Sequence, residues 1–246
     1  MFKRDARGAP GGQPAIFRKK TYTLDRFGRD LGWLLGHLDD LLAVYLGGRI
    51  EPELREAIMV AVAYENACRW CGFMHSEWAR ETGLSDEELR EATELEPPAM
   101  APSKRAAVVY ARRRAAQNFA DPDSLDERDR QLGAHFDARI RDLIEAVARL
   151  MNTANLMANS FDALLSRLSG RPAPHSRLPD ELVFGALFAL GVPMGGLGLA
   201  ILRKKGPLRL AKEFITFSEA FDWRVEQRRL PTVASARAGE GGRARA

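Results

Sequence analysis

The stretch REAIMVAVAYENACRWCGFMH, residues 55–75, holds both cysteines of the chain, Cys68 and Cys71, and His75 follows the second by four residues. Apolar residues dominate its first half, which therefore predicts a buried helix. Asn66 is predicted to end that helix, because asparagine tolerates the left-handed conformation found at helix C-termini. A second helix would begin near Cys68, so the stretch predicts a helix–turn–helix that carries a thiol pair.

This reading brings Glu56 close to the thiols. Cys68, Cys71 and His75 have the spacing i, i+3, i+7, which places all three on one helix face. Glu56 lies ten residues before the turn and His75 nine after it, so an antiparallel pair sets them at similar heights. Glu56 would polarise His75, and His75 would take the proton of Cys71. A cysteine in the first turn of a helix also feels the positive end of the helix dipole, which favours the reactive thiolate.

The pattern E-x11-C-x2-C-x3-H resembles the alkylhydroperoxidase D-like branch of the carboxymuconolactone decarboxylase superfamily, and the resemblance extends over residues 23–168. It implies that Cys71 attacks a peroxide, that Cys68 resolves the sulfenic acid, and that Glu56 and His75 relay protons. These four are the predicted catalytic residues of a thiol-dependent peroxidase or disulfide oxidoreductase.

The same resemblance implies an all-α bundle of the alkylhydroperoxidase D-like type that works as a homo-oligomer. Its partners would be a hydroperoxide or a peroxidase protein, and an external dithiol that donates electrons; no cofactor or metal is needed. Some members carry a second histidine between the cysteines, where this chain has Arg69 and Trp70.

Other functions remain open at this stage. A C-x-x-C pair also occurs in zinc sites and as an inert pair. Zinc takes four ligands: the cysteines and His75 supply three, and the fourth would be His37, His135 or Glu56. A lyase like carboxymuconolactone decarboxylase is an alternative, although that branch does not depend on a C-x-x-C pair. A non-catalytic, membrane-attached interaction module is another.

Charge is unevenly distributed along the 246 residues. Residues 1–20 carry a net +5 and residues 203–246 a net +6, which leaves −7 for the part between them. An acidic body with basic ends argues against a nucleic-acid partner, because such domains are basic on their folded face. The N-terminal residues include no apolar signal region, and C-x-x-C without an export signal predicts a cytoplasmic protein.

Composition predicts five parts. Residues 1–20 are a disordered basic tail, rich in Gly, Pro and charge, and 21–169 form the alkylhydroperoxidase D-like helical domain. A linker follows at 170–180, then an apolar and amphipathic helical extension at 181–230, and a disordered tail at 231–246. No alternating strand pattern or glycine-rich phosphate loop occurs, so the fold is predicted to be all-α. Apolar spacing from Leu24 to Tyr45 predicts one continuous helix.

Residues 182–202, LVFGALFALGVPMGGLGLAIL, contain no charge and precede Arg203-Lys204-Lys205. The length suits a membrane span, but the glycines and Pro193 at its centre interrupt a straight helix. We therefore expect two short apolar arms. They would form either a shallow hairpin on the membrane surface, with basic flanks meeting anionic lipid, or a hairpin buried in an oligomer interface.

Overall fold

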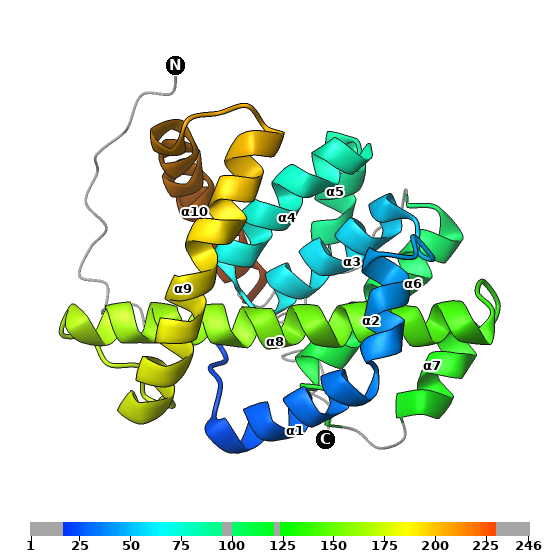
Figure 1. Cartoon of the computed structure of the whole chain (residues 1–246), viewed down its shortest axis with the longest axis horizontal. Coiled ribbons are helices and arrows are strands. Elements are labelled where there is room, and N and C mark those ends of the chain that lie inside the picture. Colours follow the sequence, from blue (N-terminus) through cyan, green and yellow to red (C-terminus); the bar gives the residue numbers. More distant parts are fainter. Residues whose placement is uncertain (1–16, 95–99, 121–123, 230–246) are drawn as a thin grey trace, which may run out of the picture.

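The computed structural model describes residues 17–94, 100–120 and 124–229, which form helices and connections without a strand among them (Figure 1). The all-α prediction is thereby confirmed. The helices are α1 (Leu24–Gly36), α2 (Leu38–Tyr45), α3 (Pro52–Glu65), α4 (Arg69–Thr82), α5 (Asp86–Thr93), α6 (Pro102–Ala116), α7 (Ser124–Leu132), α8 (Ala138–Leu168), α9 (Leu178–Leu202) and α10 (Pro207–Arg229).

The 31-residue helix α8 extends across the whole molecule, and the other helices pack along it (Figure 1). Helix α3 occupies the centre, and every residue from Glu56 to Tyr64 is buried. A helix that is apolar on all sides needs neighbours on all sides. Here α4, α5, α6 and α8 supply them. Glu56, one of the four predicted site residues, therefore lies on a helix that is enclosed on all sides.

The turn between α3 and α4 differs in one detail from its prediction. Asn66 does cap α3, but its φ of −84° is not left-handed. Ala67 takes that conformation instead, with φ 54°. Cys68 follows with an extended backbone and caps the N-terminus of α4. The side chain of Asn66 is bound to α8, because its amide donates to Asn152 Oδ1 at 2.9 Å.

The single helix predicted from Leu24 to Tyr45 is wrong. His37 breaks it, with φ −121° and ψ 31°, and separates α1 from α2. The ring of His37 stacks on Trp33 with centroids 3.8 Å apart, and its Nδ1 lies 2.9 Å from the Trp33 carbonyl oxygen. At this point the side chain of His37, in place of a backbone N–H, contacts the Trp33 carbonyl oxygen. The spacing of apolar residues in the sequence cannot reveal such a local change.

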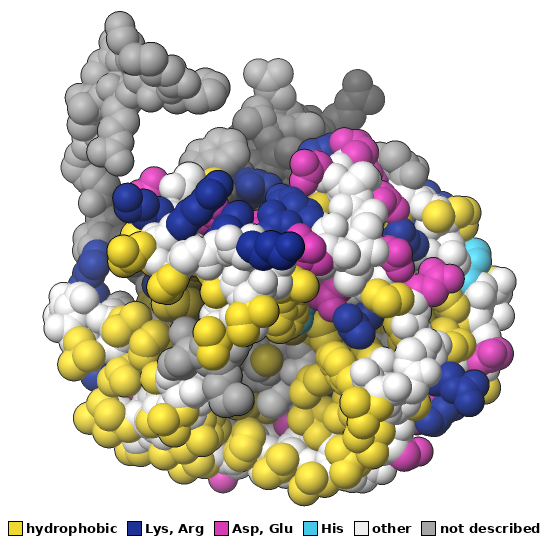
Figure 2. All heavy atoms as spheres, turned by 45° about the horizontal axis from the view of Figure 1, so that its top comes forward, with side chains coloured by type: hydrophobic (Ala, Val, Ile, Leu, Met, Phe, Trp, Pro, Cys, Tyr) yellow, Lys and Arg dark blue, Asp and Glu magenta, His cyan; other side chains and the backbone are white. Residues whose placement is uncertain are grey.

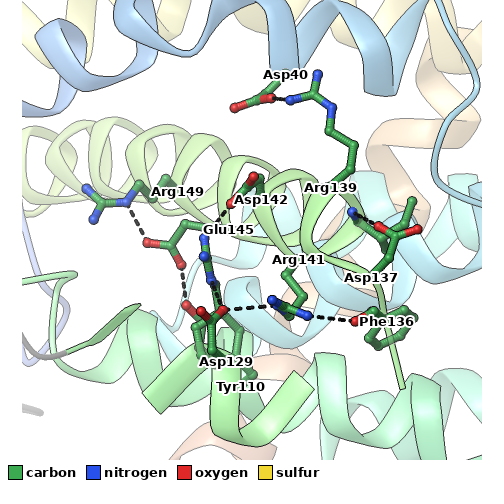
Figure 3. Close-up of polar contacts among 12 residues, drawn as sticks. Asp40, Tyr110, Asp129, Phe136, Asp137, Arg139, Arg141, Asp142, Glu145 and Arg149 are labelled. Atoms are coloured by element: carbon green, nitrogen blue, oxygen red, sulfur yellow. Dashed lines mark hydrogen bonds and ion pairs between the residues drawn. The ribbon is translucent and has the colours of Figure 1, made fainter. Parts of the chain in front are cut away.

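Buried hydrogen bonds and ion pairs connect α6 to α8 (Figure 3). Glu145 of α8 accepts hydrogen bonds from Tyr110 Oη at 2.6 Å and Arg149 Nε at 2.8 Å. Arg114 Nη2 lies 3.2 Å from the same carboxylate. Burial alone would raise the pKa of Glu145, but the charges of Arg114 and Arg149 outweigh burial and lower it. At the start of α8, Arg139 pairs with Asp40 of α2.

The N-terminal tail is shorter than predicted. Lys19 Nζ donates to Asp162 of α8 at 2.6 Å, and Lys20 Nζ donates to the carbonyl oxygens of Ala115 and Ala116 at 2.9 Å each. These bonds fix residues that were assigned to a disordered segment of 1–20. Residues 1–16, and the tail predicted at 231–246, lie outside the described part of the chain.

The hairpin predicted for 182–202 is wrong, because α9 is one continuous helix. Its start is fixed by Arg167, whose Nε lies 2.6 Å from Glu181, and its end by Arg203, whose Nε lies 3.1 Å from Glu77 of α4. Between them, Gly185 permits close packing on α8, where an added Cβ would lie 3.1 Å from Leu164. The helix begins at Leu178, so the linker predicted at 170–180 is also shorter.

One side of α9 is exposed and apolar. By length and composition the helix would qualify as a membrane span, and only 20% of its most apolar window is buried within the described structure. Figure 2 shows apolar side chains over the lower part of one face, below a group of Lys and Arg side chains. The exposed apolar residues of α9 include Leu182, Val183, Leu187, Leu190, Leu197 and Ile201. Length and composition alone do not place this helix in a membrane.

Candidate active site

The two cysteines lie at the start of α4 and both are free thiols. Cys68 is fully buried, and Cys71 is 8% exposed. The backbone N–H of Cys71 donates to Cys68 Sγ at 3.4 Å, so Cys68 acts as the side-chain cap of the helix. The turn therefore brings both sulfur atoms to the N-terminal end of one helix.

Glu56 of α3 and His75 of α4 form a direct pair, with Oε2 of Glu56 2.7 Å from Nδ1 of His75. Arg55 Nε donates to the other carboxylate oxygen at 3.0 Å. Burial by itself would raise the pKa of Glu56, but the hydrogen bond and charge of His75, helped by Arg55, lower it. An ionised Glu56 is an acceptor only, so Nδ1 of His75 carries a proton and Nε2 is free to act as a base.

The thiol of Cys71 does not have the low pKa that the helix dipole predicted. A hydrogen bond with Cys68, burial, and the charges of Cys68 and Asp162 raise the pKa of Cys71 well above its ordinary value. Burial and the neighbouring sulfur destabilise the thiolate of Cys71 more than the dipole of α4 stabilises it. Cys71 is therefore protonated at neutral pH and needs a base to react.

Asp162 of α8 is a site residue that the sequence did not reveal. Arg69 Nη2 lies 2.8 Å from its carboxylate, Trp70 Nε1 donates to it at 2.9 Å, and Lys19 approaches at 2.6 Å. Burial would raise the pKa of Asp162, but the charges of Lys19 and Arg69 lower it. The negative charge of Asp162 thus acts on Cys71. Arg69 and Trp70, the two residues between the cysteines, hold the Asp162 carboxylate in place. No signal near the C-x-x-C motif points to a residue 91 positions farther along the chain.

A cavity of about 730 Å³ opens beside the Glu56–His75 pair. Its lining comes from α2, α3, α4, α8 and the last residue of α9, and is mostly apolar. The residues are Tyr45, Arg55, Glu56, Met59, His75, Trp78, Glu81, Thr82, Leu150, Met151, Ala154 and Leu202. Neither cysteine is among them. The cavity therefore reaches Glu56 and His75 but not the two thiols.

Residues 30–113 match the model of the carboxymuconolactone decarboxylase family. This family segment contains Glu56, Cys68, Cys71 and His75, and the match confirms the superfamily resemblance. Comparison with curated proteins and with solved structures found no match. The family includes enzymes of more than one kind, so the match by itself does not distinguish a peroxidase from a decarboxylase.

Helices outside the family segment cover its thiol helix. Phe214 of α10 stacks on Trp70, with ring centroids 4.3 Å apart, and Phe188 of α9 meets the same ring at 5.8 Å. Phe221 of α10 is fully buried and packs on Tyr64 at 4.4 Å. The C-terminal extension is therefore integrated with the site.

A row of asparagines on α8 lies behind the turn. Asn152 accepts from Asn66, and Asn159 Nδ2 donates to the Asn66 carbonyl oxygen at 2.8 Å. Asn155 is fully buried, and neither its Oδ1 nor its Nδ2 has a hydrogen-bond partner among the described residues. All three asparagines of this row, Asn152, Asn155 and Asn159, are buried.

Among the described residues, no group of three or more His, Cys, Asp or Glu side chains could hold a metal ion. His37 stacks on Trp33 between α1 and α2. His135 is exposed in the turn before α8. Neither belongs to the site.

Proposed function

We propose that the protein is a thiol-dependent peroxidase or disulfide oxidoreductase that cycles a disulfide between Cys68 and Cys71. One thiol attacks the hydroperoxide, which leaves as an alcohol and converts the sulfur to a sulfenic acid. The second thiol condenses with the sulfenic acid and releases water. An external dithiol then reduces the disulfide and is itself oxidised.

The observation that carries the proposal is the contact between Glu56 and His75, one turn along α4 from a thiol whose pKa is raised. A thiol that is protonated at neutral pH gains most from a general base. His75 holds its Nδ1 proton toward Glu56 and presents Nε2 as that base. Cys71 suits the attacking role because it precedes His75 by four residues and is the more exposed thiol.

The proposal includes an external dithiol, a hydroperoxide or peroxidase partner, and a cytoplasmic location, where dithiol reductants are maintained. It also includes a homo-oligomer. The exposed apolar side of α9 would then be covered by a second copy of the chain or by a membrane surface. A defined oligomer that stays in the soluble fraction without detergent would favour the second copy, whereas protein in the membrane pellet would favour lipid.

The test is consumption of cumene hydroperoxide with several dithiol donors, by the wild type, Cys71→Ser and His75→Asn. Both variants should lose activity, and His135→Asn, which changes an exposed histidine outside the site, should retain it. Treating Cys68→Ser with peroxide should leave a sulfenic acid on Cys71 that dimedone traps. Trapping only on Cys68 in Cys71→Ser would reverse the two roles. No peroxide consumption with any donor would favour the lyase alternative.

A further inference from the structure

The cavity beside the relay has the features of a site for an amphipathic molecule. We propose that it binds an apolar organic acid, with Arg55 holding the carboxylate, and that the substrate is a hydroperoxide of such an acid. The reaction assigned to this substrate rests on the proposed function. The binding of the acid rests on the cavity alone.

The walls are suited to a hydrocarbon chain. Met59, Trp78, Leu150, Met151 and Leu202 line the cavity, and its volume of about 730 Å³ is in the range of small-molecule sites. Apolar walls with a few polar groups at one point fix the orientation of a ligand. Leu202 is the last residue of α9, so the C-terminal extension completes this wall.

The polar group that would hold the acid is Arg55, which lines the cavity. Its Nε is held by Glu56 at 3.0 Å, and its guanidinium lies over the ring of Tyr45 at 5.3 Å from the centroid. These two contacts orient the side chain, which is 21% exposed. No hydrogen bond or ion pair in the described structure engages Nη1 or Nη2. An oriented guanidinium with both terminal nitrogens free is suited to bind a carboxylate through two hydrogen bonds.

The other charged groups of the lining do not compete for this role. Glu81 is paired with Arg203, and Glu56 contacts His75 and the Nε of Arg55, which leaves the two terminal nitrogens of Arg55 for a ligand. Of the described residues that line the cavity, Arg55 is the one Arg or Lys. A carboxylate that enters the cavity therefore meets a single fixed cation.

The geometry also limits where the reacting group lies on the acid. The carboxylate of Glu56 contacts both Arg55 and His75. The side chains of Arg55 and His75 are therefore separated by little more than the width of a carboxylate. A ligand carboxylate on Arg55 then places the next few atoms beside His75. This arrangement favours a 2-hydroperoxy acid whose apolar tail fills the rest of the cavity. The two thiols would reduce it to the 2-hydroxy acid and water, with formation of their disulfide.

The experiment measures binding by calorimetry, with 2-hydroxydodecanoate as the acid and dodecane-1,2-diol as its uncharged match. We expect the wild type to prefer the acid at least tenfold. Arg55→Gln should bind the acid about ten- to a hundredfold more weakly, the range for a hydrogen bond to a charged group, yet bind the diol as the wild type does. Arg55→Lys should recover part of the loss. Arg49→Gln, on an exposed residue outside the cavity, is the matched control.

Equal affinity for acid and diol, or an Arg55→Gln variant that binds the acid normally, would overturn the inference even if cumene hydroperoxide is consumed. The variant with both cysteines changed to serine should bind the acid like the wild type, because the thiols do not line the cavity. Arg55-dependent binding of the acid without turnover of any hydroperoxide would support the carboxylate site and overturn the peroxidase function.

Discussion

Replacing Gly72 by alanine tests whether α10 is packed firmly over the thiol helix. Gly72 follows Cys71 and faces Phe221 of α10. An added Cβ would lie 2.7 Å from Phe221 Cε2 and 3.3 Å from Cδ2. Carbon atoms pack best at about 3.5–4.0 Å, so the nearest pair would overlap severely. The ring has little room to move, because Phe221 is fully buried and packs on Tyr64 at 4.4 Å.

We expect Gly72→Ala to lower the free energy of unfolding by about 1–3 kcal/mol, the usual cost of overpacking a core. Denaturation in urea measures this loss. The control is Gly32→Ala in α1, where an added Cβ meets nothing within 4 Å. That variant should gain up to about 1 kcal/mol, because alanine is the better helix former.

A second variant makes the test specific to Phe221. Phe221→Leu shortens the side chain, so the double variant with Gly72→Ala should lose less than the sum of the single losses, by about 0.5–3 kcal/mol. Cys71 should also be alkylated faster in Gly72→Ala, since α10 is loosened. Additive losses, or a stable Gly72→Ala variant with unchanged alkylation, would refute the reasoning.

Three more predictions concern ionisable groups. Glu56→Gln and His75→Asn should each slow peroxide reduction, and the double variant should be little slower than either; multiplicative losses would show independent roles. Asp162→Asn should lower the pKa of Cys71, seen as faster alkylation at fixed pH, because it removes a charge that raises that pKa. Burial and Glu145 raise the pKa of Tyr110, so the unfolded chain loses this proton first. Stability to urea should therefore fall above about pH 10, less so in Tyr110→Phe.

The sequence predicted those features of the site that depend on residues close to one another along the chain. The spacing from Glu56 through the cysteines to His75 lies within one helix–turn–helix, so helical geometry alone brings these residues together. Asp162 could not be predicted, because its place near Cys71 depends on how α8 packs. The continuous helix α9 was missed for a related reason. Its central glycines and Pro193 disfavour a straight helix locally, whereas packing on α8 and ion pairs at both ends favour it.

The family segment ends before α8, and this has a consequence for protein engineering. A chimera that received only residues 30–113 would inherit Glu56 and His75 with both thiols. It would lack Asp162, whose charge opposes ionisation of Cys71, and Met151, which lines the cavity. With that charge absent, its thiols would ionise more readily, and the cavity that we propose as the substrate site would lose part of its wall. Transplanting the chemistry of this protein therefore requires α8 and the end of α9 as well as the motif.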